Sequence, residues 1–147
     1  MEHIKIDNFI QENPNIDFPS FESLDNKSCE SIRLMLLERL KLDSSISDLL
    51  LVKAVDDFGE IYDASECNKD ALDLKEVLLS LGETCPEYVY INWYRYDDID
   101  KMKFSDLVNY FDDIWYPDVD DIDVFDESLN WVLSITHYGQ VKFLKFR

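Results

Sequence analysis

The sequence has little glycine, proline and histidine, and each shortage excludes a class of protein. Only 3 glycines and 4 prolines occur in 147 residues, which argues against a turn-rich β-sandwich and against a low-complexity linker. Phosphate-binding loops need several glycines at fixed spacing, and Gly59, Gly82 and Gly139 do not supply it. Nucleotide chemistry through such loops is therefore excluded.

Cysteine is also scarce, and its 3 positions include no CxxC spacing. An odd number of scattered cysteines is typical of reduced thiols rather than of a disulfide framework. The first residues, MEHIKIDNFI, lack the basic start and the long apolar stretch of a secretory signal. No apolar run approaches the roughly 20 residues that a membrane-spanning helix needs. The sequence thus predicts a soluble, cytoplasmic protein.

Catalytic patterns are missing as well. The 2 histidines are His3 and His137, and no GxSxG motif is present. Ser134 lies three residues before His137, a spacing that places the two side chains on opposite faces of a strand. We therefore expect no serine–histidine catalysis and no cofactor, and we predict that the protein is not an enzyme.

Positive charge is the last shortage. Lys and Arg number 14 against 32 Asp and Glu, which gives a formal net charge of −18. Such a charge repels nucleic-acid phosphates and anionic membranes, and it attracts cationic partners. It argues against binding of nucleic acid or membrane and favours a basic protein as the partner. The alternative is that the charge only keeps the protein in solution.

The sequence does contain enough apolar material for a core, with 46% hydrophobic and 14% aromatic residues. Its length of 147 residues and the lack of a linker predict one domain over residues 1–147. Apolar residues recur at helical spacing over 29–41, 46–59 and 70–82. Ser45 and Asp48 resemble a capping box at the start of the second helix. Residues 1–27 give no clear pattern, because Pro14 and Pro19 interrupt it.

Strand patterns follow in the second half. Alternating residues predict strands over 87–96, 121–124, 131–137 and 141–144. A helix is predicted over 104–115, ending before Pro117, and a hairpin turn is predicted at 137–140, with Gly139 free to take a positive φ. The fold class is therefore α+β, in which N-terminal helices pack on a C-terminal, mostly antiparallel sheet that contains one inserted helix.

Acidic residues are densest between Asp97 and Glu127, where twelve acids face two lysines and several aromatic residues lie among or beside them. Aromatic anchors surrounded by carboxylates suit an interface with a basic protein, because the carboxylates bind Lys and Arg while the rings exclude water. The alternatives are a solvated acidic face and aromatic residues that fill the core. The candidate partner-binding residues are Asp97, Asp98, Asp112, Asp113, Asp118, Asp120, Asp121, Asp123, Tyr94, Tyr96 and Tyr116.

The first predicted strand contains four tyrosines at even-numbered positions. Tyr88, Tyr90, Tyr94 and Tyr96 would share one face of a strand over 87–96. That face is either part of the core or exposed and adhesive, and the pattern does not choose between these two possibilities.

The acidic run from Asp118 to Asp123 also resembles a metal-binding segment. An EF-hand loop that starts at Asp118 needs glycine at its sixth position and glutamate at its twelfth, but those positions hold Asp123 and Leu129. We expect no metal site, although Asp121 and Asp123 on one strand face could bind Ca²⁺ or Mg²⁺ fortuitously. A metal-dependent hydrolase therefore stays as a minor alternative.

The C-terminal third resembles a known family. The residues that carry the resemblance are Trp115-Tyr116-Pro117, Asp120-Asp121, Phe125-Asp126, Trp131 and His137-Tyr138-Gly139. This pattern is similar to small bacterial immunity proteins of polymorphic-toxin and contact-dependent-inhibition loci. The resemblance implies a protein that binds and neutralises a cognate toxin domain, often a basic nuclease, and it implies structural roles for Trp115, Trp131 and Gly139. The alternative function is a non-enzymatic ligand-binding or scaffolding module.

Overall fold

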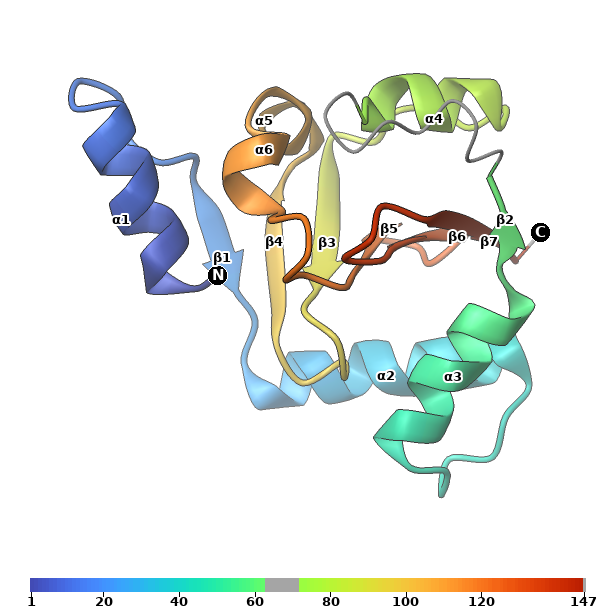
Figure 1. Cartoon of the computed structure of the whole chain (residues 1–147). Helices are drawn as coiled ribbons and strands as arrows, with labels where there is room; N and C mark the ends of the chain where they lie inside the picture. The colour runs from blue at the N-terminus through green and yellow to red at the C-terminus, as the bar shows by residue number, and fades with distance from the viewer. Residues whose placement is uncertain (63–71, 147) are drawn as a thin grey trace.

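The computed structural model describes residues 1–62 and 72–146, which form a seven-stranded antiparallel sheet with helices on both faces (Figure 1). The strand order is β1-β4-β3-β5-β6-β7-β2. This arrangement confirms the predicted α+β class. The strands are β1 (Phe21–Ser23), β2 (Glu60–Ile61), β3 (Tyr88–Asn92), β4 (Ile99–Lys103), β5 (Ile122–Asp126), β6 (Trp131–Ile135) and β7 (Val141–Lys145).

Helices cover the sheet on both sides. In Figure 1, α2 and α3 lie against one face, α4, α5 and α6 lie against the other, and α1 lies beside β1 at one end of the molecule. Among the described residues, no helix is long and apolar enough to cross a membrane. The helices are α1 (His3–Glu12), α2 (Asn26–Leu40), α3 (Asp48–Phe58), α4 (Leu74–Ser80), α5 (Phe104–Asn109) and α6 (Phe111–Ile114).

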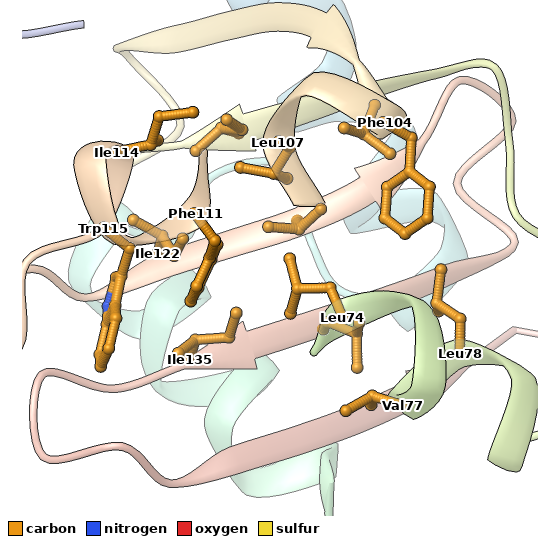
Figure 2. Close-up of a cluster of buried hydrophobic side chains, with 14 of the residues drawn as sticks. Leu74, Val77, Leu78, Phe104, Leu107, Phe111, Ile114, Trp115, Ile122 and Ile135 are labelled. Atoms are coloured by element: carbon orange, nitrogen blue, oxygen red, sulfur yellow. The ribbon is translucent and has the colours of Figure 1, made fainter. Parts of the chain in front are cut away.

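Alternation along the strands builds two cores. Val124 of β5 packs with the core under α4, α5 and α6, whereas its neighbour Phe125 packs with the core under α2 and α3. Leu133 and Val132 of β6 divide in the same way, because successive strand residues point to opposite faces. Figure 2 shows the first core, where side chains from α4, α5 and α6 meet over the strands.

Helix ends follow capping chemistry, with one correction to the prediction. The side chain of Asp25 accepts a hydrogen bond from the Ser28 amide at 2.7 Å at the start of α2. The cap of α3 is Ser47 rather than the predicted Ser45, whose amide instead bonds to Asp43 in a turn. The predicted start of the third helix near residue 70 lies outside the described residues.

Some predicted boundaries were wrong. The strand predicted over 87–96 ends at Asn92, and the loop 93–98 leads back into β4, which was not predicted. The helix predicted over 104–115 is broken at Tyr110, where φ is −119°. The hairpin is confirmed: Gly139 has φ 86°, and its amide donates to the Thr136 carbonyl at 2.8 Å.

The predicted tyrosine face does not exist as one surface, because the strand ends early. Tyr90 stacks on Phe125 with ring centroids 5.6 Å apart and borders the core under α2 and α3. Tyr88 is half-buried, and the Lys101 ammonium lies 5.0 Å from the centre of its ring. Tyr94 and Tyr96 belong to the loop after the strand.

Candidate binding surface at one end of the sheet

Three loops meet at one end of the sheet because neighbouring strands are antiparallel. Asn92, at the end of β3, is paired with Ile99 of β4 and with Asp123 of β5, and Asp123 is paired with Ser134 of β6. The segments that leave or enter the strands here are therefore brought together from distant parts of the sequence. These loops are 93–98, 115–121 and 136–140.

Hydrogen bonds join two of these loops and close the third on itself. The Asp118 amide donates to the His137 carbonyl at 2.7 Å. The His137 amide donates to Oδ1 of Asp121 at 2.7 Å, and the His137 ring Nδ1 lies 2.9 Å from the same oxygen. Within the first loop, the Trp93 amide donates to the Asp98 carbonyl at 2.9 Å. The loops 115–121 and 136–140 are thus joined directly, whereas the loop 93–98 is tied to β5 by the hydrogen bond that Tyr96 OH donates to Asp123.

Exposed apolar and acidic side chains share this surface. Tyr94, Val119 and Tyr138 are 41%, 69% and 54% exposed, and exposed carboxylates lie in two of these loops, 93–98 and 115–121. Large exposed apolar side chains that are grouped together and bordered by polar residues are a feature of interaction sites. We use the term loop-end surface for Tyr94, Asp97, Asp98, Asp118, Val119, Asp121 and Tyr138.

Asp123 does not belong to this surface, because β5 points its side chain inward under α2 and α3. The carboxylate is 9% exposed and accepts bonds from Ser134 Oγ, from Tyr96 OH at 2.7 Å and from Asn92 Nδ2 at 3.1 Å. Burial raises the pKa of Asp123, although these three hydrogen bonds act to lower it. Asp123 therefore holds three strands and a loop together.

Tyr96 is buried beside Asp123 and is only 2% exposed. Its amide donates to Oδ1 of Asn92 at 2.7 Å, so both its backbone and its side chain fix the loop 93–98. Burial, reinforced by the Asp123 charge, raises the pKa of Tyr96 well above its usual value. We therefore leave the predicted contact residues Tyr96 and Asp123 out of the proposed binding surface.

Asp120 and Tyr116 bind the N-terminal helix instead of facing solvent. The ammonium of Lys5, in α1, is fully buried and forms an ion pair with Oδ2 of Asp120. The same ammonium lies 3.8 Å from the centre of the Tyr116 ring and 5.3 Å from that of Trp93, distances at which cation–π attraction operates. The Tyr116 amide also donates to Asp120 at 2.8 Å. This Lys5 cage is a second correction to the predicted contact set.

Asp112 and Asp113 lie on α6, outside the three loops. Burial raises the pKa of Asp113, and the charges of Glu12 and Asp112 raise it further. Glu12, at the end of α1, is therefore the acid that the fold brings close to Asp113. Asp112 and Asp113 do not join Asp97, Asp98 and Asp121 on one surface. The dense acidic segment of the sequence is thus divided among different parts of the fold.

Two hollows open on the loop-end surface, and both are lined by Tyr94 and Asp121. The inner hollow has a volume of about 190 Å³ and lies between α3 and the strand ends, with Val52 and His137 among its lining residues. The outer hollow has a volume of about 330 Å³ and is also lined by Glu2, Trp93, Asp98 and Val119.

The outer hollow is crowded with acids. The pKa of Asp98 is raised, first by partial burial and then by the charges of Asp100, Asp97 and Glu2, although the N-terminal ammonium opposes this effect. The exposed cation of the loop is Arg95, whose guanidinium lies 5.4 Å from the centre of the Tyr94 ring. A cationic group placed here would relieve the repulsion among the carboxylates.

The inner hollow does not contain a catalytic triad. Ser134 and His137 line it together, contrary to the prediction of opposite faces, because β6 ends at Ile135 and His137 lies in the turn. The Ser134 hydroxyl, however, donates to Asp123, and the His137 ring is paired with Asp121. In the described ranges, no group of three His, Cys, Asp or Glu side chains is placed to hold a metal ion.

Comparison with protein-family models, with curated proteins and with solved structures gives no significant match. Sequence reasoning missed Val119 and Tyr138 as exposed apolar residues, and it missed Glu2 and Lys5 as neighbours of the acidic loops. The sequence feature that pointed to this region was the high density of acids in its loops. That density does not show which side chains are exposed.

Proposed function

We propose that this protein binds a basic protein domain through its loop-end surface and acts, without catalysis, as an immunity protein that neutralises a cognate toxin. The observation that carries the proposal is the gathering of exposed side chains from three loops, Tyr94, Val119 and Tyr138, beside carboxylates from two of these loops. Such side chains supply the contacts that exclude water at an interface.

Charge supports a basic partner. With a net charge of −18, the whole molecule attracts cations, and the carboxylates of the loop-end surface lie where association would begin. The raised pKa of Asp98 reflects burial and carboxylate repulsion that the nearby ammonium does not offset. Lys or Arg of a partner would supply the missing positive charge.

Neutralisation is supported by the resemblance of the C-terminal third to immunity proteins. Two of the loops that form the surface lie inside that third, and they contain Asp121, His137 and Tyr138. A protein bound there would have its own basic face covered. For a nuclease, that face is the one that contacts the phosphates of its substrate, so covering it would block activity.

The direct test uses the product of the neighbouring gene as the candidate toxin. We expect a 1:1 complex by calorimetry and protection of cells that express the toxin. The triple variant Asp97→Asn, Asp98→Asn and Asp121→Asn should weaken binding by about tenfold or more, or about 1.4 kcal/mol, and should reduce its salt dependence.

The matched control changes net charge equally at exposed acids elsewhere, with Glu30→Gln, Glu38→Gln and Asp112→Asn. This control should bind within about twofold of wild type, because nonspecific charge is a smaller effect than local contacts. Equal weakening by both triple variants would contradict the assignment of the surface. A neighbouring toxin that is neither bound nor neutralised would contradict the proposed function.

A further inference from the structure

The inner hollow has the size of one side chain rather than of a whole ligand. Its volume of about 190 Å³ is below the range of roughly 300–1,000 Å³ that is usual for sites of drug-sized molecules. An occupant therefore has to be narrow, and a long side chain from a bound protein fits this limit.

The walls of the inner hollow suit the methylene stem of a Lys or Arg side chain. Val52 projects from α3 on one side, and Tyr94 and Tyr138 stand at the loops on the other. Both tyrosines are about half exposed, at 41% and 54%, so their rings can be covered further by a partner. Lys and Arg bury their methylene stems against such surfaces while the charged end reaches polar groups.

The polar residues that line the hollow include three carboxylates. Asp123 lies at its base, and Asp121 and Asp56 are exposed at its rim. Lys142 already pairs with Asp56 at 2.7 Å. Oδ1 of Asp121 takes both contacts with His137, and no hydrogen bond to its Oδ2 occurs within the described part of the chain. That second oxygen is therefore available to an incoming cation.

The Lys5 cage shows the same chemistry already in use in this molecule. There, one ammonium is held by the carboxylate of Asp120 and the rings of Tyr116 and Trp93. The inner hollow repeats the set with the carboxylate of Asp121 and the rings of Tyr94 and Tyr138. The difference is that Arg95, the cation at the Tyr94 ring, is not among the residues that line the hollow. The cation that would fill the hollow therefore comes from outside.

We infer that the inner hollow receives one long cationic side chain, arginine or lysine, of the bound partner, an inference that rests on the proposed function. The stem lies between Val52 and the two tyrosines, and the charged group binds Oδ2 of Asp121. The partner's side chain would be a central contact of the complex, surrounded by the weaker carboxylate pairs of the loop 93–98.

The test needs no toxin. Butylguanidinium and butylammonium, with uncharged butylurea as control, are titrated into the isotope-labelled protein, and the NMR signals of the Val52 methyls and the Thr136 amide are followed. We expect saturable shifts with the cations and none with butylurea. Tighter binding of the guanidinium would assign an arginine, and tighter binding of the ammonium would assign a lysine.

Two variants and two controls localise the binding. Val52→Phe fills the hollow and Asp121→Asn removes its charge, and each should weaken cation binding by about tenfold or more. Leu49→Phe, which is exposed on α3 outside the hollow, and Asp97→Asn should bind the cations as wild type does. Absence of saturable shifts, or unchanged binding in Val52→Phe, would overturn the inference.

The same Val52→Phe variant separates this inference from the proposed function. If it binds the basic partner as tightly as wild type while the Asp97/Asp98/Asp121 triple variant does not, the inference fails and the proposed function stands. If cations bind the hollow in a Val52-dependent way but the neighbouring toxin is not bound, the cation site stands and the proposed function fails.

Discussion

Tyr94 has a backbone conformation that is rare for a residue with a side chain, with φ 113°. Tyr96, two residues later, has φ 62° but gains buried hydrogen bonds in return. Tyr94 is 41% exposed and gains no comparable hydrogen bond from the residues that the structure describes. Residues held in such conformations cost about 1–3 kcal/mol and are concentrated at functional sites. The strain at Tyr94 is consistent with a ring held out for binding.

Replacing Tyr94 with glycine should separate stability from binding. Glycine adopts positive φ without strain, so the free energy of unfolding of Tyr94→Gly should stay unchanged or rise by up to about 1 kcal/mol. Affinity for the basic partner should fall. Urea unfolding and calorimetry give the two quantities. Tyr138→Gly is the matched control, because Tyr138 is exposed but does not have a positive φ, and it should show no gain in stability.

Single residues were the hardest to place from the sequence. Asp120, Asp121 and Asp123 stand close together in the sequence, yet one is exposed and two are buried. The reason for Asp120 is Lys5, which lies 115 positions earlier. No local pattern reports a partner so distant. Acidic density therefore predicted the region of the candidate surface, and only the fold could select its members.

Helix α1 shows how polar contacts can hold a whole element in place. It buries two of its residues, Lys5 and Phe9. Phe9 packs edge-on against Phe18 and Tyr110, with ring centroids 5.3 and 5.5 Å away. The N-terminal ammonium just before the helix forms an ion pair with buried Asp100. The remaining face of α1 is largely exposed, so the Lys5 cage supplies a large share of its attachment.

Lys5→Met should therefore loosen α1 and lower stability. The substitution leaves Asp120 buried without its counter-ion, and removal of one partner of a buried pair costs about 3–5 kcal/mol. Urea unfolding measures the loss, and hydrogen exchange at residues 3–12 shows whether the helix detaches. The double variant Lys5→Met/Asp120→Asn should recover much of the stability. If Lys5→Met is as stable as wild type, the cage does not hold the helix.

Elements with clear apolar spacing could be predicted, whereas those fixed by buried polar pairs could not. Helices α2 and α3 and strands β5 to β7 follow ordinary apolar patterns and appear near their predicted positions. Strand β4 has Asp100 at a fully buried position, where it accepts bonds from Ser23 at 2.6 Å and from the Trp93 indole at 2.8 Å. In β4 the buried Asp100 and the two lysines leave only Ile99 and Met102 as apolar residues, whereas β5 keeps Ile122, Val124 and Phe125 around its own buried Asp123.

The whole molecule carries a large negative charge, and burial disfavours the ionised form of several of its acids. Burial is the main cause of the raised pKa values of Asp98, Asp113 and Asp123. For an acid with a raised pKa, the protonated form is favoured in the folded state. Its contribution to stability is complete below the ordinary pKa and is lost as pH rises through the raised value. Asp25 and Asp43, whose pKa values are lowered by hydrogen bonds with serine, act in the opposite direction at exposed sites.

We therefore expect the free energy of unfolding to fall as the pH rises from the ordinary carboxyl pKa of about 4 through the raised values, because three acids with raised pKa values and the general repulsion act together. Added salt should reduce this fall by screening the repulsion. Urea unfolding over a pH series that starts at about 4, with and without about 0.5 M salt, measures both effects. Asp123→Asn should show a smaller change with pH. Higher stability at the more alkaline pH would contradict this account.

The two outer strands of the sheet, β1 and β2, come from the N-terminal part of the chain, and they determine when the protein can fold. Phe21 pairs with Met102, and Glu60 pairs with Phe143. During synthesis the apolar faces of α2 and α3 leave the ribosome long before the strands that cover them. Contacts between such distant residues also form slowly. The growing chain therefore exposes Leu36, Leu37, Leu51 and Val55 until β5, β6 and β7 have emerged, and it depends on its many charges to avoid aggregation during that interval.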